Sequence, residues 1–183
     1  MNSARSSVGR LTAARRAVVA LPLLLGACGI RDSGPPAPPV ASRALPEVIF
    51  QTAQNETVAT ADLKGRAVLA VFWATGCEAC AAMRAAGERL YKHAAPDTWF
   101  LGVNEDEQRQ TWKDYMDRHP SALTEVWDKD HAFRRNLGMV EEPSAVLMDR
   151  SGRVRWRSPG WTAGTEAEAL ALLTSLERER PPE

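Results

Sequence analysis

Apolar residues along the chain occur either in short continuous runs or at the spacing of one helix face. The clearest run, Ala67–Trp73, is rich in β-branched and aromatic residues and predicts a strand buried on both faces of a sheet. Further strands are predicted at 48–50, 56–58, 99–103, 124–127, 145–148 and 154–157, and helices at 78–93, 107–118, 129–136 and 165–177. Strands separated by helices indicate an α/β domain with a central mixed sheet and helices on both faces.

Turn residues and charges refine this prediction at three places. Asn55 marks a turn between 48–50 and 56–58, and both of these short segments are predicted to be edge strands. Residues Asp149–Gly152 form a turn of the hairpin type between the last two strands. The adjacent Arg134 and Arg135 are predicted to lie on a solvent-exposed helix face.

The first 27 residues have the pattern of an export signal. Residues 1–16 contain four arginines and no acid, and an apolar run of eleven residues, 17–27, follows them. This run is short for a bilayer span. It ends in Leu25-Gly26-Ala27-Cys28, which resembles a bacterial lipobox. That resemblance implies cleavage after residue 27 and a lipid on Cys28, whereas the alternatives are an ordinary signal peptide with an incidental cysteine or a short buried helix.

The next segment is predicted to be a tether. Residues 29–46 contain five prolines, a composition that favours extended polyproline II structure over a folded core. The chain therefore divides into a signal at 1–27, a lipidated cysteine and tether at 28–46, and a folded domain at 47–183.

Composition and charge exclude several classes of protein. Hydrophobic residues make up 44% of the chain and charged residues 25%, as in an ordinary folded domain rather than a disordered or fibrous one. The 23 basic and 23 acidic side chains give a net charge of zero. Removal of residues 1–27 would leave 19 basic and 23 acidic side chains, a charge of −4. Such a domain has no electrostatic attraction for nucleic acid or for anionic lipid.

The candidate chemistry lies directly after the buried strand, in the sequence Cys77-Glu78-Ala79-Cys80. Two cysteines three positions apart at the start of a helix are close enough to form a disulfide. The first is expected to face solvent, where the helix N-terminus stabilises its thiolate, and the second to be partly covered one turn later. Cys77 is therefore the expected nucleophile, and Cys80 the cysteine that resolves a mixed disulfide.

Other uses of two cysteines stay open. Half a zinc site would need two more ligands, for which His93, His119 and His131 are available without a second CxxC motif. A copper site could use His131, although copper-delivery proteins of related fold resemble CxxxC rather than CxxC. The pair could also be a structural clip in a binding module. Thiol peroxidases resemble PxxxTxxC, and the proline of that pattern is missing here.

The motifs together resemble the thioredoxin fold, and more closely its TlpA/ResA-like branch of membrane-tethered thiol–disulfide oxidoreductases. The resemblance covers about residues 45–176 and is carried by the segments 62–65, 72–74, 77–80, 102–104, 137–139 and 142–149, followed by Gly152. It implies a thioredoxin-like fold with an N-terminal strand extension. The strand and helix between about 98 and 119 are similar to the insertion that separates this branch from plain thioredoxins.

The resemblance also implies roles for residues around the cysteines. Pro143 would be a cis-proline facing them, leaving the backbone of Glu142 free to pair with an incoming peptide. Trp73 would shield the disulfide. Val71 stands where thioredoxins carry a buried acid, so proton transfer with Cys80 would need another group or water, and Glu78 and Glu142 are candidates for that group. Both charges would also raise the pKa values of the thiols.

The function implied is thiol–disulfide exchange with protein partners in the bacterial envelope. Most members of this branch are reductants, including those that act on apocytochrome c, so we expect a reductant supplied by a membrane thiol donor. The lipid on Cys28 would hold the protein at a membrane facing the periplasm. The next residue is Gly29, and the absence of an aspartate there resembles lipoproteins sorted to the outer membrane. We expect no cofactor, no metal and no nucleic acid partner.

Overall fold

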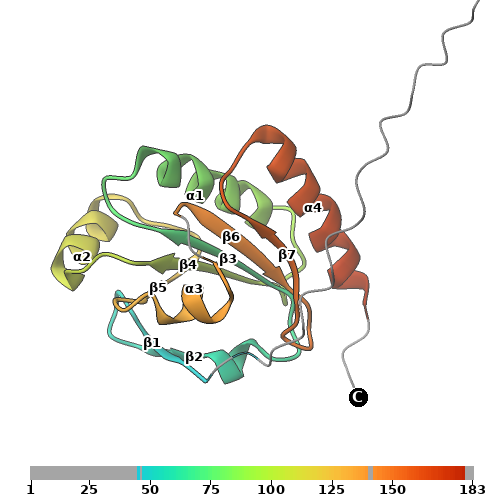
Figure 1. The fold of residues 1–183 in the computed structure, drawn as a ribbon, viewed down its shortest axis with the longest axis horizontal. Coiled ribbons are helices and arrows are strands. Elements are labelled where there is room, and N and C mark those ends of the chain that lie inside the picture. Colours follow the sequence, from blue (N-terminus) through green and yellow to red (C-terminus); the bar gives the residue numbers. More distant parts are fainter. Residues whose placement is uncertain (1–44, 46, 140–141, 180–183) are drawn as a thin grey trace, which may run out of the picture. The chain divides into compact units, whose positions relative to one another are not determined.

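The computed structural model describes residues 45, 47–139 and 142–179, which all belong to one folded unit (Figure 1). Its strands are β1 (Ile49–Thr52), β2 (Thr57–Ala59), β3 (Val68–Trp73), β4 (Trp99–Asn104), β5 (Thr124–Trp127), β6 (Ser144–Met148) and β7 (Val154–Ser158). Its helices are η1 (Thr60–Leu63), α1 (Glu78–Tyr91), α2 (Arg109–Arg118), α3 (Ala132–Asn136) and α4 (Ala163–Arg178). The predicted signal, Cys28 and nearly all of the tether lie outside the described residues.

The seven strands form one mixed sheet in the order β2-β1-β5-β4-β3-β6-β7. The inner strand β3 is parallel to β4 and antiparallel to β6, and all six of its residues are buried. The predicted mixed sheet is therefore confirmed. The prediction of two edge strands is half wrong, because β1 pairs on one side with β2 and on the other with β5, so only β2 lies at that edge.

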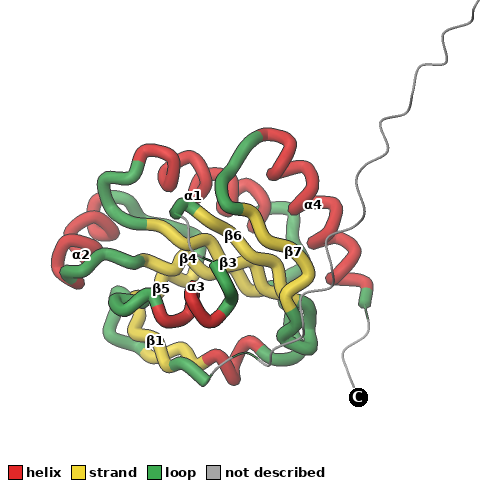
Figure 2. The backbone as a smooth tube through the Cα atoms, in the orientation of Figure 1, coloured by secondary structure: helices red, strands yellow, loops and turns green. Residues whose placement is uncertain are grey.

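The two faces of the sheet are covered by different helices. Side chains alternate between faces along a strand, so Leu69 and Val71 of β3 pack with residues of α1 and α4, whereas Phe72 points the other way. There Phe72 contacts Phe133 of α3, at 5.8 Å between ring centroids, and Phe50 of β1 contacts the same ring at 5.1 Å. Figures 1 and 2 show α1 and α4 on one side of the sheet and α3 on the other.

Helix α3 begins three residues later than predicted because of a side-chain cap. The carboxylate of Asp128 accepts the backbone N–H groups of Ala132 at 3.1 Å and Phe133 at 2.9 Å, which have no partner within the helix. His131 precedes them with φ of 53°, outside the helical region. The segment 129–131 is therefore a turn that reaches the cap rather than the first part of the helix.

None of the helices in the described ranges combines the length and the apolar character needed to cross a bilayer.

Candidate functional site

The site is built where the buried strand β3 passes into helix α1. Cys77 is the residue that caps α1, and it forms a disulfide with Cys80, whose Cα lies 5.2 Å from its own. The Cys80 backbone N–H donates to Cys77 Sγ at 3.1 Å, so the end of the helix points at this sulfur. Cys77 is half-buried and Cys80 is completely buried. The predicted contrast between an accessible and a covered cysteine is confirmed.

The loop before Cys77 is held by the end of the neighbouring strand β4. Asp106 accepts the backbone N–H of Thr75 at 2.8 Å and also its hydroxyl. Asn104 orients Asp106 through two hydrogen bonds, and the Glu105 N–H donates to the carbonyl of Trp73 at 2.9 Å. The segment that leads to Cys77 is therefore held by residues at the end of the neighbouring parallel strand rather than by contacts within the loop.

Pro143 immediately precedes β6 on the other side of β3. The Glu142–Pro143 peptide bond is cis, as the resemblance implies. Because Ser144 pairs in register with Phe72, Pro143 comes beside the end of β3, from which the chain continues to Cys77. Glu142 and Glu78 are both exposed, so water screens their charges from the thiols. That weakens the expectation that these two acids act on Cys80.

An aromatic cluster surrounds the covered cysteine. Cys80, Trp73 and Trp112 are all buried and pack together, with Tyr115 and Trp127 against them. The predicted position of Trp73 beside the disulfide is confirmed by this packing. Trp112 comes from α2, so the segment between 98 and 119 contributes directly to the surroundings of Cys80.

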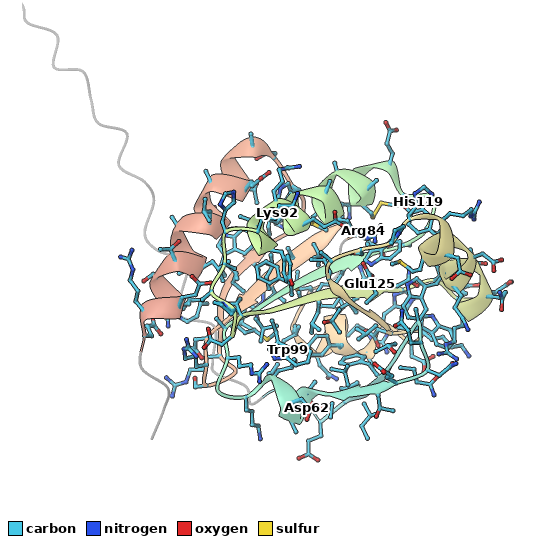
Figure 3. The ribbon with its side chains drawn as sticks, turned by 180° about the vertical axis from the view of Figure 1, so that it is seen from behind. Asp62, Arg84, Lys92, Trp99, His119 and Glu125 are labelled. Carbon is cyan, nitrogen blue, oxygen red and sulfur yellow. A yellow bond between two sulfur atoms is a disulfide. The ribbon has the colours of Figure 1, made fainter. Side chains whose placement is uncertain are left out.

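A buried ion pair lies behind this cluster, and the sequence analysis missed it. Glu125 of β5 accepts from Arg84 of α1 at 2.9 Å and from Trp73 Nε1 at 3.0 Å (Figure 3). Its carboxylate passes over Gly102 of β4, where a Cβ atom would come within 2.3 Å of it. The signals for this pair were an acid inside a short strand otherwise made of β-branched and aromatic residues, and an arginine one helical turn after Cys80.

Two opposing influences act on the Glu125 carboxyl group. Burial is the larger and holds the pKa of Glu125 above its usual value, since it disfavours the charged form. The charge of Arg84 and hydrogen bonds from Arg84, Ser121 and Trp73 act in the opposite direction.

A second buried acid, Glu105, lies at the end of β4. Its side chain is fully buried, 3.0 Å from Arg134 Nε and 3.3 Å from His131 Nδ1. Burial, followed by a hydrogen bond with Glu142, raises the pKa of Glu105 to about 9, against the effect of Arg134. The prediction that Arg134 is solvent-exposed is wrong, because its side chain turns inward to this acid, whereas Arg135 is exposed as predicted.

The histidines named in the metal alternatives lie in different surroundings. His131 pairs with Glu105, His119 stacks on Tyr115 at 4.3 Å between ring centroids, and His93 lines a separate pocket. Within the described ranges, His, Cys, Asp and Glu side chains form no group of three or more that could hold a metal ion.

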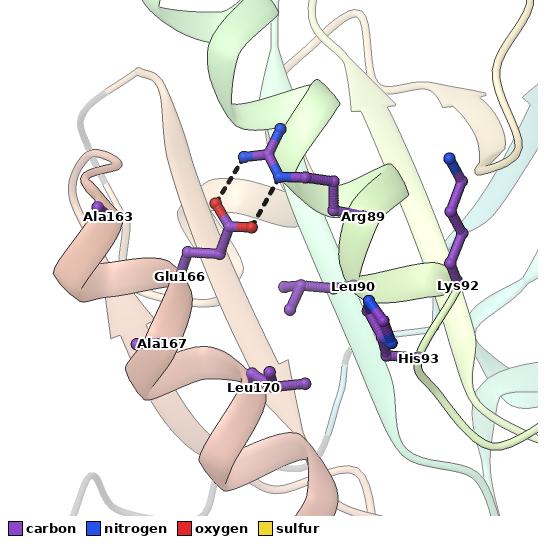
Figure 4. Close-up of a pocket in the computed structure, with 8 residues that line it drawn as sticks. All are labelled: Arg89, Leu90, Lys92, His93, Ala163, Glu166, Ala167 and Leu170. Carbon is purple, nitrogen blue, oxygen red and sulfur yellow. Dashed lines mark hydrogen bonds and ion pairs between the residues drawn. The ribbon is translucent and has the colours of Figure 1, made fainter.

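The pocket that contains His93 lies between the second half of α1 and α4 (Figure 4). Arg89 and Glu166 form a two-pronged ion pair across it, at 2.8 and 2.6 Å. At 1.5 Å per helical residue, Arg89 is about 18 Å along the helix from Cys77. This pocket is therefore separate from the cysteine site.

Comparison with known proteins identifies a family model and several relatives that this chain matches. A family model described as Redoxin matches residues 39–173. The thiol:disulfide interchange protein DsbE of Pseudomonas aeruginosa is 29% identical over 101 residues, which are 55% of this chain and 54% of that protein. The thiol-disulfide oxidoreductase ResA of Bacillus thuringiensis is 22% identical over 110 residues, 60% of this chain and 64% of that protein. The chain thus spans between about half and two thirds of these curated relatives.

Solved structures show that the fold is that of thioredoxin. A secreted disulfide oxidoreductase of Mycobacterium tuberculosis superposes with a TM-score of 0.60 at 17% identity, covering 70% of this chain and 96% of that one. An exposed lipoprotein thioredoxin of Streptococcus pneumoniae gives a TM-score of 0.63 at 20% identity, covering 72% of this chain and all of that one. The predicted fold class is therefore confirmed.

The raised pKa of Glu105 predicts a specific dependence of stability on pH. Between about pH 4.5 and 9 the folded state keeps a proton that the unfolded state has released. This contribution to stability is complete below about pH 4.5 and is lost as the pH rises towards 9, with a slope of at most about 1.4 kcal/mol per pH unit. Glu105→Gln cannot ionise, so its stability relative to wild type should increase from pH 5 to pH 9 in urea unfolding.

Two further variants complete this measurement. Glu142→Gln removes the neighbour that helps to raise the pKa of Glu105, so it should lower that pKa. The pH-dependent loss of stability should then end at a lower pH than in wild type. Glu78→Gln changes an exposed acid and should follow wild type at every pH. A constant difference between Glu105→Gln and wild type across this range would contradict the assignment.

Proposed function

Because this chain belongs to the Redoxin family and has the thioredoxin fold, we propose that it exchanges dithiol for disulfide with protein partners through Cys77 and Cys80. The observation that carries this proposal is the disulfide at the start of α1, with one sulfur accessible and the other buried. The names of the relatives support it, since ResA and DsbE are described as a thiol-disulfide oxidoreductase and a thiol:disulfide interchange protein.

The reaction starts from the reduced pair. The Cys77 thiolate attacks one sulfur of the partner's disulfide, forming a mixed disulfide and releasing the partner's other sulfur as a thiolate that takes a proton. Cys80 then loses its proton and attacks Cys77 Sγ, closing the intramolecular disulfide and releasing the second partner sulfur as a thiol. Two electrons and two protons pass to the partner. The helix N-terminus that points at Cys77 Sγ favours the thiolate needed in the first step.

Residues around the disulfide would position the partner. The backbone of Glu142, before cis-Pro143, would pair with an extended segment of the incoming protein. Trp73 packs against Cys80 and keeps water from one side of the disulfide. Glu78 is an exposed acid in the first turn of α1, where it would meet an approaching partner.

We infer that the protein acts as a reductant, for substrates such as those of cytochrome c maturation, and is itself reduced by a membrane thiol donor. Negative charge disfavours the thiolate that makes a strong oxidant, and the exposed acids at positions 78 and 142 add to this effect only weakly, through water.

We also infer that the protein is anchored by a lipid on Cys28 and faces the periplasm, with the outer membrane as the favoured site. The lipobox-like sequence 25–28 and the proline-rich segment after it support this location.

Substitution of each cysteine separates their roles. Cys77→Ser should abolish reduction of a disulfide substrate such as insulin, because the nucleophile is gone. Cys80→Ser should still attack but should accumulate the mixed disulfide with its partner, because the resolving thiol is missing. Non-reducing electrophoresis and mass spectrometry detect the adduct. Trapping through Cys80 in Cys77→Ser, rather than through Cys77, would reverse the assignment.

The reduction potential of the pair tests the direction of electron flow. A reductant should have a potential near or below about −230 mV, close to that of thioredoxin. Equilibration with glutathione or dithiothreitol buffers measures it. A potential near about −120 mV, typical of a strong periplasmic oxidant, would instead assign the protein as a disulfide donor.

Substitution of Cys28 tests the anchor. When the full chain is expressed in a Gram-negative host, it should remain in the membrane fraction after an alkaline wash, and Cys28→Ser should not be lipidated. The matched control is Cys77→Ser, which should stay with the membrane. Retention of the lipid-derived mass increase in Cys28→Ser would reject the lipobox.

A further inference from the structure

We propose that Glu125 is a positioning residue for the resolving step: it neutralises Arg84 behind Cys80 and thereby keeps Cys80 a protonated thiol until the mixed disulfide forms. This inference rests on the proposed redox role of Cys77 and Cys80. It goes further because it assigns control of Cys80 to Glu125 and Arg84, which lie outside the Cys77–Cys80 motif.

Arg84 has the position required to act on Cys80. The two residues lie one helical turn apart on the same face of α1, where the Cβ atoms of such pairs are about 6 Å apart. The guanidinium of Arg84 stacks on Trp73, with its carbon 4.1 Å from the ring centroid. Trp73 packs in turn against Cys80. The positive charge is therefore held against the aromatic cluster that packs on Cys80, in a region that water screens little.

Although burial raises the pKa of Glu125, its hydrogen-bond partners are those of an ionised counter-ion to Arg84. Its carboxylate accepts from Arg84 Nη2 at 2.9 Å, from Arg84 Nε at 3.3 Å and from Trp73 Nε1 at 3.0 Å, and also from Ser121. All of these partners are donors, which suits the ionised form, and a guanidinium keeps its proton in proteins. The side chains of Arg84 and Glu125 are only 8% and 5% exposed, so each charge depends on the other.

Further polar groups that face the pair come from α2 and from His119 directly after it. The Tyr115 hydroxyl lies 3.5 Å from Arg84 Nη1, Met116 Sδ lies 3.6 Å from Arg84 Nη2, and His119 stacks on the Tyr115 ring. Tyr115 and Met116 are neutral groups on the guanidinium. Glu125 is the carboxylate that the structure pairs with Arg84, and it therefore balances the charge of Arg84 near Cys80.

This balance has a direct consequence for the redox couple. An unpaired Arg84 would stabilise the Cys80 thiolate and with it the dithiol form, which would make the couple more oxidising. Paired with Glu125, Arg84 presents little net charge to Cys80. The thiol then gives up its proton only when it attacks Cys77 in the mixed disulfide, as a reductant requires. The exposed Glu78 and Glu142 act through water and contribute less.

The test is the thiol pKa of Cys80 in the reduced full chain carrying Cys77→Ala. Alkylation of the Cys80 peptide, followed by mass spectrometry from pH 6 to pH 10, measures it without interference from Cys28. A unit charge on the order of 10 Å away changes a pKa by roughly one unit at an effective dielectric constant of about 20. Glu125→Gln keeps the shape of the side chain and should lower the Cys80 pKa by about that amount.

A second variant separates charge from shape and from loss of stability. The double variant Arg84→Met, Glu125→Gln removes both charges and should return the Cys80 pKa to its wild-type value. It also avoids a buried unpaired arginine, so it should fold even where Glu125→Gln alone is unstable. The matched control is Glu166→Gln in α4, which breaks the exposed pair with Arg89 (Figure 4). Arg89 lies on α1, as Arg84 does, and loss of its partner should leave the Cys80 pKa unchanged.

The intact CxxC protein distinguishes failure of this inference from failure of the proposed function. With Cys77 present, Glu125→Gln should favour the dithiol by roughly tenfold at a pH above both thiol pKa values. A reversible couple that Glu125→Gln leaves unshifted, or a Cys80 pKa that the double variant fails to restore, would overturn the role of Glu125. If wild type has no reversible couple, the proposed function itself fails.

Discussion

The start of helix α1 at the end of the buried strand β3 is the constraint on which the site depends. Because Cys77 caps the helix, its sulfur receives the helix N-terminus, and Cys80, one turn later, is carried under the surface against Trp73. One backbone transition therefore makes two chemically different sulfurs from two identical residues. That transition is held in place by the hydrogen bond that the Thr75 N–H donates to Asp106 and by the one that the Glu105 N–H donates to the Trp73 carbonyl.

Strand order explains how distant residues reach this point. Strands β3, β4 and β5 run parallel, so their carboxyl ends lie side by side at one end of the sheet. Trp73, Glu105 and Asp128 lie at or just beyond those ends. The antiparallel strand β6 starts at this same end of the sheet, which brings cis-Pro143 beside the end of β3. The site is assembled from four strand ends.

The two buried acids depend on the same physical rule. A carboxyl group removed from water either finds a positive partner or keeps its proton. Glu125 has Arg84 and several other donors. Glu105 shares its surroundings with Glu142 and is held towards the protonated form in spite of Arg134. Burial therefore raises the pKa values of both carboxyl groups, and their arginine partners act in the opposite direction.

The linear pattern alone determined the strands, the helices within a few residues, the mixed sheet and the candidate cysteines, because these follow from local periodicity and from spacing within one helix turn. The family resemblance added the cis-proline. Only the tertiary structure decided that β1 is internal, that Arg134 turns inward and that Glu125 reaches over Gly102 to Arg84. Glu125 and Arg84 are 41 residues apart, and only the pairing of β4 with β5 and the packing of α1 bring them together. Charge pairing across a sheet depends on strand order, which local periodicity does not contain.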